Sequence, residues 1–271
     1  YAKLYVDQQN RLDTSRNHSC EHLLQKSLQE SISKTIYQQG ASKTAERVTF
    51  DFSYADKLST DKIIKAEDKV NDYIKTNAPV TVREMTLEAA KALGAKAFFE
   101  KVYAKLGNKL RVVLMENVTA EICAGTHVKN LGDIQEYMII DYESKGAGFW
   151  RITGISGKDN INHFLTQHIG EYKNQIQKMI LDLKNKNVKN DEFDKLVATV
   201  SFDLNRKNYH ILKDQMVLIN EKYKDLLKDF EHQANVDESN NVKNEFDKSN
   251  KVKFKVFNNI DKKVLVNALN M

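Results

Sequence analysis

Four side chains of the kinds that bind zinc occur in this sequence as two closely spaced pairs. The first pair is His18 and His22, and the second is Cys123 and His127. Three residues separate the members of each pair, and on a helix this spacing brings both side chains onto one face. One pair of histidines is a weak signal, but two nitrogen and sulfur pairs together match the ligand preference of zinc. The sequence therefore predicts a single Zn²⁺ site built from all four residues.

The ligand set limits the chemistry of such a site. One thiolate and three neutral histidines leave a residual positive charge, which attracts a carbonyl oxygen or lowers the pKa of a bound water. Four protein ligands close a structural site, whereas a catalytic site keeps a position for water or substrate, and the sequence leaves both open. Helical geometry turns Cys20 and Glu21 away from the histidine face. We expect a buried Cys20 and a solvated or salt-bridged Glu21.

Composition narrows the class of protein. The chain has 271 residues with one proline and ten glycines, which favours long helices, and its net charge of +5 suits a nucleic-acid partner. Two cysteines are too few for a secreted disulfide framework and indicate reduced thiols in the cytoplasm. The longest apolar runs are too short for a membrane span.

Residues 1–157 predict an α+β domain with helices packed on a largely antiparallel sheet. We expect His18 and His22 in the first turns of a helix that begins at Thr14 or Ser15 and ends near Tyr37, with Gly40 in the loop that follows. The other expected elements are strands at 4–6, 47–52, 79–85, 111–115, 118–123, 133–142 and 148–155, and helices from Ser59 or Thr60, from Thr86 to Gly94, and over 95–106.

Residues 158–234 predict a helical hairpin, because apolar residues recur at three-and-four spacing over 160–187 and 202–233. Its polar outer faces suggest an oligomer contact. Residues 235–250 are rich in Asn, Lys and acids, so we expect a linker or disordered segment there. A strand at 251–257 and a helix at 260–269 would begin a truncated C-terminal domain.

Several collinear motifs between residues 6 and 157 resemble one protein family. Residues 16–24 read RNHSCEHLL, and 121–128 read EICAGTHV. These segments resemble the R-N-H-S-A-T-H-L-L and E-L-C-G-G-T-H-V motifs of alanyl-tRNA synthetase editing domains. Further similar stretches are 38–40, 47–53, 94–101, 130–134 and 148–152.

The resemblance implies hydrolysis of the ester bond of alanine tRNA mischarged with serine or glycine. It also implies metal ligation by His18, His22, Cys123 and His127, and a glutamine of the editing pocket at Gln38. The chain would then be the editing part and helical segment of a synthetase that ligates alanine to its tRNA with ATP, without the aminoacylation domain. We expect zinc and Gln38 to place the ester and the water. Thr126 and nearby backbone amides would add hydrogen bonds.

Three other interpretations remain. A free-standing editing protein usually carries a β-rich domain before the first histidine motif, and residues 1–15 are too short to supply one. A threonyl-tRNA synthetase editing domain is the second interpretation. Its motif tends to read C-x-G-P-H, and Thr126 at the position of the proline argues against it. A binding module with a closed zinc site would dock tRNA without hydrolysis. The chain departs from the editing motifs at Cys20, Glu21, Ala41, Ala124 and Trp150.

Overall fold

The structure is a computed structural model that describes residues 3–96 and 109–247, together with 264 and 266. The chain divides into two compact units. The first comprises residues 1–169 and 203–211, and the second comprises 170–202 and 212–271. The predicted division at 157 and 234 stays a prediction. Among the described helices, none combines the length and the apolarity needed to cross a bilayer.

Two antiparallel sheets lie in the first unit, which confirms the predicted α+β class. One sheet has the strand order β1-β2-β7-β6 and the other has the order β3-β4-β5. The strands of the first sheet are β1 (Gln38–Lys43), β2 (Val48–Ser53), β6 (Tyr137–Gly146) and β7 (Phe149–Ser156). Those of the second are β3 (Val80–Met85), β4 (Leu110–Met115) and β5 (Thr119–Ile122).

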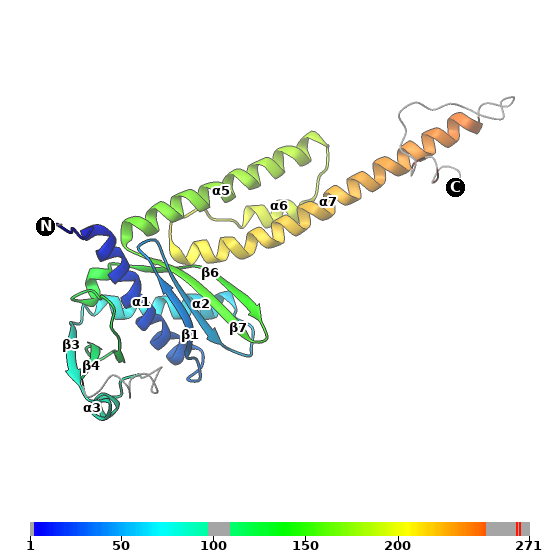
Figure 1. The fold of residues 1–271 in the computed structure, drawn as a ribbon. Coiled ribbons are helices and arrows are strands. Elements are labelled where there is room, and N and C mark those ends of the chain that lie inside the picture. Colours follow the sequence, from blue (N-terminus) through cyan, green and yellow to red (C-terminus); the bar gives the residue numbers. More distant parts are fainter. Residues whose placement is uncertain (1–2, 97–108, 248–263, 265, 267–271) are drawn as a thin grey trace. The chain divides into compact units, whose positions relative to one another are not determined.

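Helices α1 (Gln8–Ser31) and α2 (Thr60–Lys75) form the core of this unit with the first sheet. The predicted Ser59 cap of α2 is confirmed, because its side chain accepts a hydrogen bond from the backbone of Lys62. Helix α1 packs on α2 and on β1, β2 and β7 (Figure 1). The buried apolar side chains at this junction include Leu23, Leu24, Leu28, Phe50, Phe52, Ile63 and Val70. Burial on several sides holds α1 rigidly, and α1 carries the two histidines.

The first helix begins and ends earlier than its sequence predicts. Asp7 caps it by accepting a hydrogen bond from the backbone of Asn10, and the expected strand at residues 4–6 is absent. Asp7 is as good a cap as Ser15, and local pattern cannot choose between two caps in one polar stretch. The helix ends at Ser31 instead of Tyr37. His18 and His22 therefore lie in the middle of the helix and not in its first turns.

Gly40 lies in a strand and not in a loop, which corrects a second expectation. Residues 38–43 form β1 and pair with β2, and the register shifts between Gln38 and Gly40. A glycine inside a strand often marks such a bulge. The other strand predictions from 47 to 155 correspond to observed strands within a few residues, except that 131–134 form a 3₁₀ turn. The short helix α3 (Leu87–Ala92) follows its predicted Thr86 cap.

Three further helices follow the sheets: α5 (Lys158–Asn185), α6 (Asp191–Ala198) and α7 (Arg206–Asp247). Two long helices were predicted, but α6 was missed because its eight residues are too few for a clear period. In the second unit, the hydroxyl group of Tyr223 in α7 donates a hydrogen bond to Asp182 in α5. Figure 1 shows the three helices running beside one another.

The expected linker at 235–250 is wrong over 235–247, because α7 continues to Asp247. The polar composition hides a buried face. Ser239 is fully buried and donates a hydrogen bond to the carbonyl oxygen of Val264, and Val242 is buried as well. The strand expected at 251–257 lies outside the described residues, as do nearly all of the helix expected at 260–269 and residues 97–106 of the helix expected from Ala95.

Candidate metal centre

Helix α1 supplies the first ligand pair. His18 and His22 are one turn apart in the middle of the helix, and both side chains are buried. Asn17, beside His18, is also buried and fixes this part of the helix. Its amide group donates hydrogen bonds to the carbonyl oxygens of Thr44 and Ala45, and it accepts one from Ser156.

The segment after β5 supplies the second ligand pair. Cys123 follows the strand directly, and Arg111 of β4 donates a hydrogen bond of 2.6 Å to its carbonyl oxygen. Gly125 lets this segment approach α1 closely. A Cβ atom at Gly125 would lie 2.1 Å from the Cε1 atom of His18, which is inside the van der Waals limit. The backbone can therefore pass His18 only because residue 125 has no side chain.

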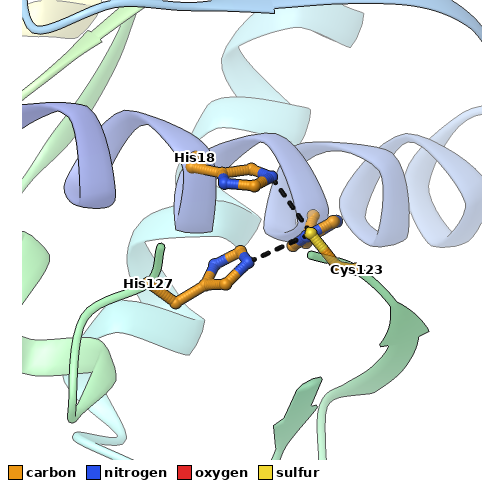
Figure 2. Close-up of side chains that lie close together, drawn as sticks. His18, Cys123 and His127 are labelled. Atoms are coloured by element: carbon orange, nitrogen blue, oxygen red, sulfur yellow. Dashed lines mark hydrogen bonds between the residues drawn. The ribbon is translucent and has the colours of Figure 1, made fainter. Parts of the chain in front are cut away.

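The two segments bring the four predicted ligands together, as the sequence spacing indicated. One ligand atom from each of His18, His22, Cys123 and His127 lies within 4.8 Å of the other three. The Sγ atom of Cys123 is 3.3 Å from the Nε2 atom of His18 and 3.4 Å from that of His127 (Figure 2). Tetrahedral zinc with bonds of about 2.0–2.3 Å separates its ligand atoms by about 3.3–3.8 Å. The donor set and the two distances from Sγ of Cys123 therefore fit Zn²⁺.

Each histidine uses its Nδ1 atom away from the cluster. The Nδ1 atom of His18 is 3.1 Å from the carbonyl oxygen of Thr126. That of His127 is 3.1 Å from the hydroxyl oxygen of Ser19, which also accepts a hydrogen bond from the backbone of Val128. That of His22 contacts the carboxylate of Glu121. Protons on these Nδ1 atoms leave the Nε2 atoms free for a metal, which is the tautomer that zinc ligation requires.

The surroundings shift the pKa values of the three imidazoles in different directions. Burial, together with the neighbouring His22, lowers the pKa of His18 to about 3, and the same causes lower that of His127. Burial also opposes the charged form of His22, but the adjacent Glu121 outweighs it and raises the pKa of His22 to about 10. The Nε2 atom of His22 is buried and has no hydrogen-bond partner among the described residues. A metal ion would give this nitrogen a partner.

Cys20 and Glu21 lie outside the four-residue cluster. Cys20 is fully buried in the apolar core. Glu21 is also buried, and its carboxylate lies 3.1 Å from the Nζ atom of Lys43 in β1. Of the two environments expected for Glu21, the structure has the salt bridge.

The two residues expected to act on substrate differ in their placement. Thr126 lies between Cys123 and His127, and its carbonyl oxygen contacts His18. Gln38 is half-buried at the start of β1, opposite Phe52. Their participation in chemistry stays a prediction.

Residues that contact the ligands from outside were missed by sequence reasoning. Glu121 is the main example, with Lys96 beside it and Ser19 behind His127. Glu121 and Cys123 are two positions apart, and this spacing places side chains on the same face of an extended chain. That pattern could have identified Glu121. No local pattern connects Lys96 to the site.

Several basic residues that could contact the phosphates of an RNA have acidic partners within the chain. They are Arg16 with Asp13, Lys43 with Glu21, Lys145 with Glu143, and Arg151 with Asp51. The indole of Trp150, which departs from the family motif, donates a hydrogen bond to the carbonyl oxygen of Tyr54. Each of these five side chains therefore has a partner within the chain.

Comparison with known proteins gives one matching family model and many related proteins. Residues 110–153 match the model described as "Threonyl and Alanyl tRNA synthetase second additional domain". This segment runs from β4 to β7 and includes Cys123 and His127.

Related proteins match far beyond that segment. An alanine–tRNA ligase of Malacoplasma penetrans is 36% identical over 255 residues, which cover 94% of this chain and 27% of the relative. One from Ureaplasma parvum is 36% identical over 91% of this chain and 25% of the relative. One from Desulfitobacterium hafniense is 38% identical over 58% of this chain. The chain thus spans about a quarter of the length of the curated relatives that match most of it.

Proposed function

We propose that this chain, a homologue of one part of the alanine–tRNA ligases, edits mischarged alanine tRNA. The reaction is hydrolysis of the ester that joins serine or glycine to the tRNA. The observation that carries the proposal is the convergence of His18, His22, Cys123 and His127 from two distant segments. In the whole synthetase, the same protein would ligate alanine to its tRNA with ATP.

The four ligands would hold Zn²⁺, which supplies positive charge toward a carbonyl oxygen or a water at the site. The protein's own part is to fix the ligands. Thr126 and Ser19 orient His18 and His127 through their Nδ1 atoms, so both rings present Nε2. Gly125 keeps the Cys123–His127 segment against α1.

Residues around this centre would position the substrate. Gln38 would orient the ester, and Thr126 with adjacent backbone amides would donate hydrogen bonds to the oxygen that becomes negative during hydrolysis. Arg111, which holds the carbonyl oxygen of Cys123, places a guanidinium group beside the same segment. A phosphate of the tRNA 3′ end is a suitable partner for such a group.

The test compares two cysteine variants. Cys123→Ala removes a ligand, whereas Cys20→Ala changes a buried cysteine that points into the core. Cys123→Ala should lose bound zinc and slow deacylation of serine-charged alanine tRNA by at least about 100-fold, in the range for losing a metal-based catalytic interaction. Cys20→Ala should keep both zinc and activity.

A second candidate function is a zinc-stabilised module that binds tRNA without hydrolysing it, and four protein ligands favour it because they can close the zinc sphere. Zinc-loaded protein that binds charged tRNA but leaves the ester intact, at any protein concentration, would establish the second function and refute the first.

A further inference from the structure

We propose that Glu121 is the positioning residue of the metal centre: it fixes the ring of His22 so that Nε2 faces the other three ligands. This inference rests on the metal centre proposed above and adds a residue outside the ligand set. Its chemistry is that of a carboxylate that accepts a hydrogen bond from the Nδ1–H group of a metal-bound imidazole, which orients the ring and makes it a better ligand.

The contact with Glu121 occurs where water has little access. Glu121 is 2% exposed and His22 is 4% exposed. One carboxylate oxygen contacts the Nδ1 atom of His22, and the other lies 3.4 Å from the Nζ atom of Lys96. Apart from these ion pairs, neither oxygen accepts a hydrogen bond from a described residue. On the side that faces α1, the carboxylate of Glu121 therefore serves to hold the ring of His22.

Lys96 holds Glu121 in place from the opposite side. The backbone of Lys96 donates a hydrogen bond to the carbonyl oxygen of Ala120 and accepts one from Ile122, so it spans the backbone of Glu121. This pairing fixes the side chain of Lys96 beside Glu121. Lys96 also balances the charge of a buried carboxylate, which would otherwise be costly to remove from water.

A second acid near His22 provides the matched control. Glu21 is as buried as Glu121, but its closest carboxylate oxygen is 3.8 Å from the same Nδ1 atom and 3.1 Å from Lys43. Both acids place charge near the imidazole, but only Glu121 is close enough to accept a hydrogen bond from its Nδ1–H group. A general effect of nearby negative charge would therefore make the two acids equivalent, whereas positioning makes Glu121 dominant.

The experiment measures metal binding by the purified full chain, with Glu121→Gln compared with Glu21→Gln. Competition against a chromogenic chelator gives the zinc affinity, and Co²⁺ absorption reports the geometry of the centre. Glu121→Gln should weaken zinc binding about 10–100-fold and change the Co²⁺ spectrum. Glu21→Gln should stay within about threefold of the unsubstituted chain. Equal weakening in the two variants, or none in Glu121→Gln, would overturn the inference.

A measurement on the unsubstituted chain keeps the test decisive if Glu121→Gln does not fold. With ¹¹³Cd in place of zinc, NMR of the ¹⁵N-labelled protein should show scalar coupling from the metal to Nε2 of His22 and a proton retained on Nδ1. Coupling to Nδ1 would refute the proposed role. If the unsubstituted chain binds no metal, the proposed function fails with it. If the chain binds metal but hydrolyses no ester, only the function fails.

Discussion

At the scale of single residues, Gly125 has no room for a side chain beside His18. A Cβ atom there would lie 2.1 Å from Cε1 and 2.5 Å from Nδ1 of His18, so Gly125→Ala must displace the imidazole or the segment that carries Cys123. We expect at least a tenfold loss of zinc affinity, measured by chelator competition, because a ligand moved by about 1 Å no longer completes a tetrahedral centre.

The neighbouring position is the control for Gly125. Ala124 is exposed, and the family motif has glycine there, so Ala124→Gly should bind zinc like the unsubstituted chain. Normal affinity in Gly125→Ala would mean that the segment can retreat from α1 without cost, which would contradict the close packing at this point.

The sequence predicted the ligands but not the residues that orient them. Spacing alone identified His18, His22, Cys123 and His127, because ligand type and an interval of four residues are local properties. Glu121 and Lys96 act through a contact between β5 and the segment before residue 97. Such a contact depends on strand register and on tertiary packing, which a single sequence does not encode in a local period.

At the scale of elements, the contact between α1 and α2 makes a prediction about pH. The hydroxyl group of Tyr73 in α2 donates a 2.5 Å hydrogen bond to Glu30 in α1, and Lys26 and Lys69 lie 3.1 and 3.3 Å from the same carboxylate. Slight burial opposes ionisation, but Tyr73 and Lys26 outweigh it and lower the pKa of Glu30. Burial and Glu30 together raise the pKa of Tyr73.

Tyr73→Phe should therefore lower the free energy of unfolding by about 0.5 kcal/mol at pH 7, a small value because the pair is partly exposed. The stability from Glu30 is present above its unfolded pKa of about 4.3 and is lost as pH falls through the lower folded pKa. Urea unfolding should thus show the variant and the parent converging below about pH 4. Tyr37→Phe, at an exposed tyrosine, is the control. A difference that widens in acid would contradict this account.

Element prediction succeeded where one signal dominated and failed where two competed. Thr86 caps its helix as predicted, and of the adjacent candidates Ser59 and Thr60 the structure uses Ser59. At the first helix, Asp7 and Ser15 are both suitable caps, and the structure uses Asp7. Gly40 favours a turn by its type, but the structure places it in a strand that pairs with β2. Backbone hydrogen bonds across a sheet outweigh such a local preference.

At the scale of the whole molecule, α7 is shared between the two units. Residues 203–211 group with the first unit, whereas the helix from Leu212 onward belongs to the second. The sequence placed 158–234 in one helical region, because the apolar period of α7 is the same on both sides of residue 212. The first turns of α7 differ from the rest of the helix because they make polar contacts to Glu67 of α2, which lies 139 residues from Arg206 and 143 from His210.

Those contacts centre on Glu67, a buried carboxylate in α2 that is 1% exposed. It pairs with the guanidinium group of Arg206, lies 3.0 Å from the Nε2 atom of His210, and accepts a 2.6 Å hydrogen bond from the backbone of Ile139. Arg206 also donates a hydrogen bond of 2.8 Å to Glu136. Removing Arg206 leaves a buried negative charge with one fewer partner, which is costly because water cannot replace the guanidinium.

Arg206→Met, which keeps the apolar stem, should lower the free energy of unfolding by about 2–3 kcal/mol in urea denaturation, somewhat below the range for a fully buried pair because Arg206 is partly exposed. Lys207→Met, at the adjacent exposed position, should change it by less than about 0.5 kcal/mol. In the double variant with Glu67→Gln, the cost of Arg206→Met should fall by more than about 1 kcal/mol, since the buried charge is gone. Strict additivity of the two changes would mean that Arg206 stabilises the start of α7 through packing alone.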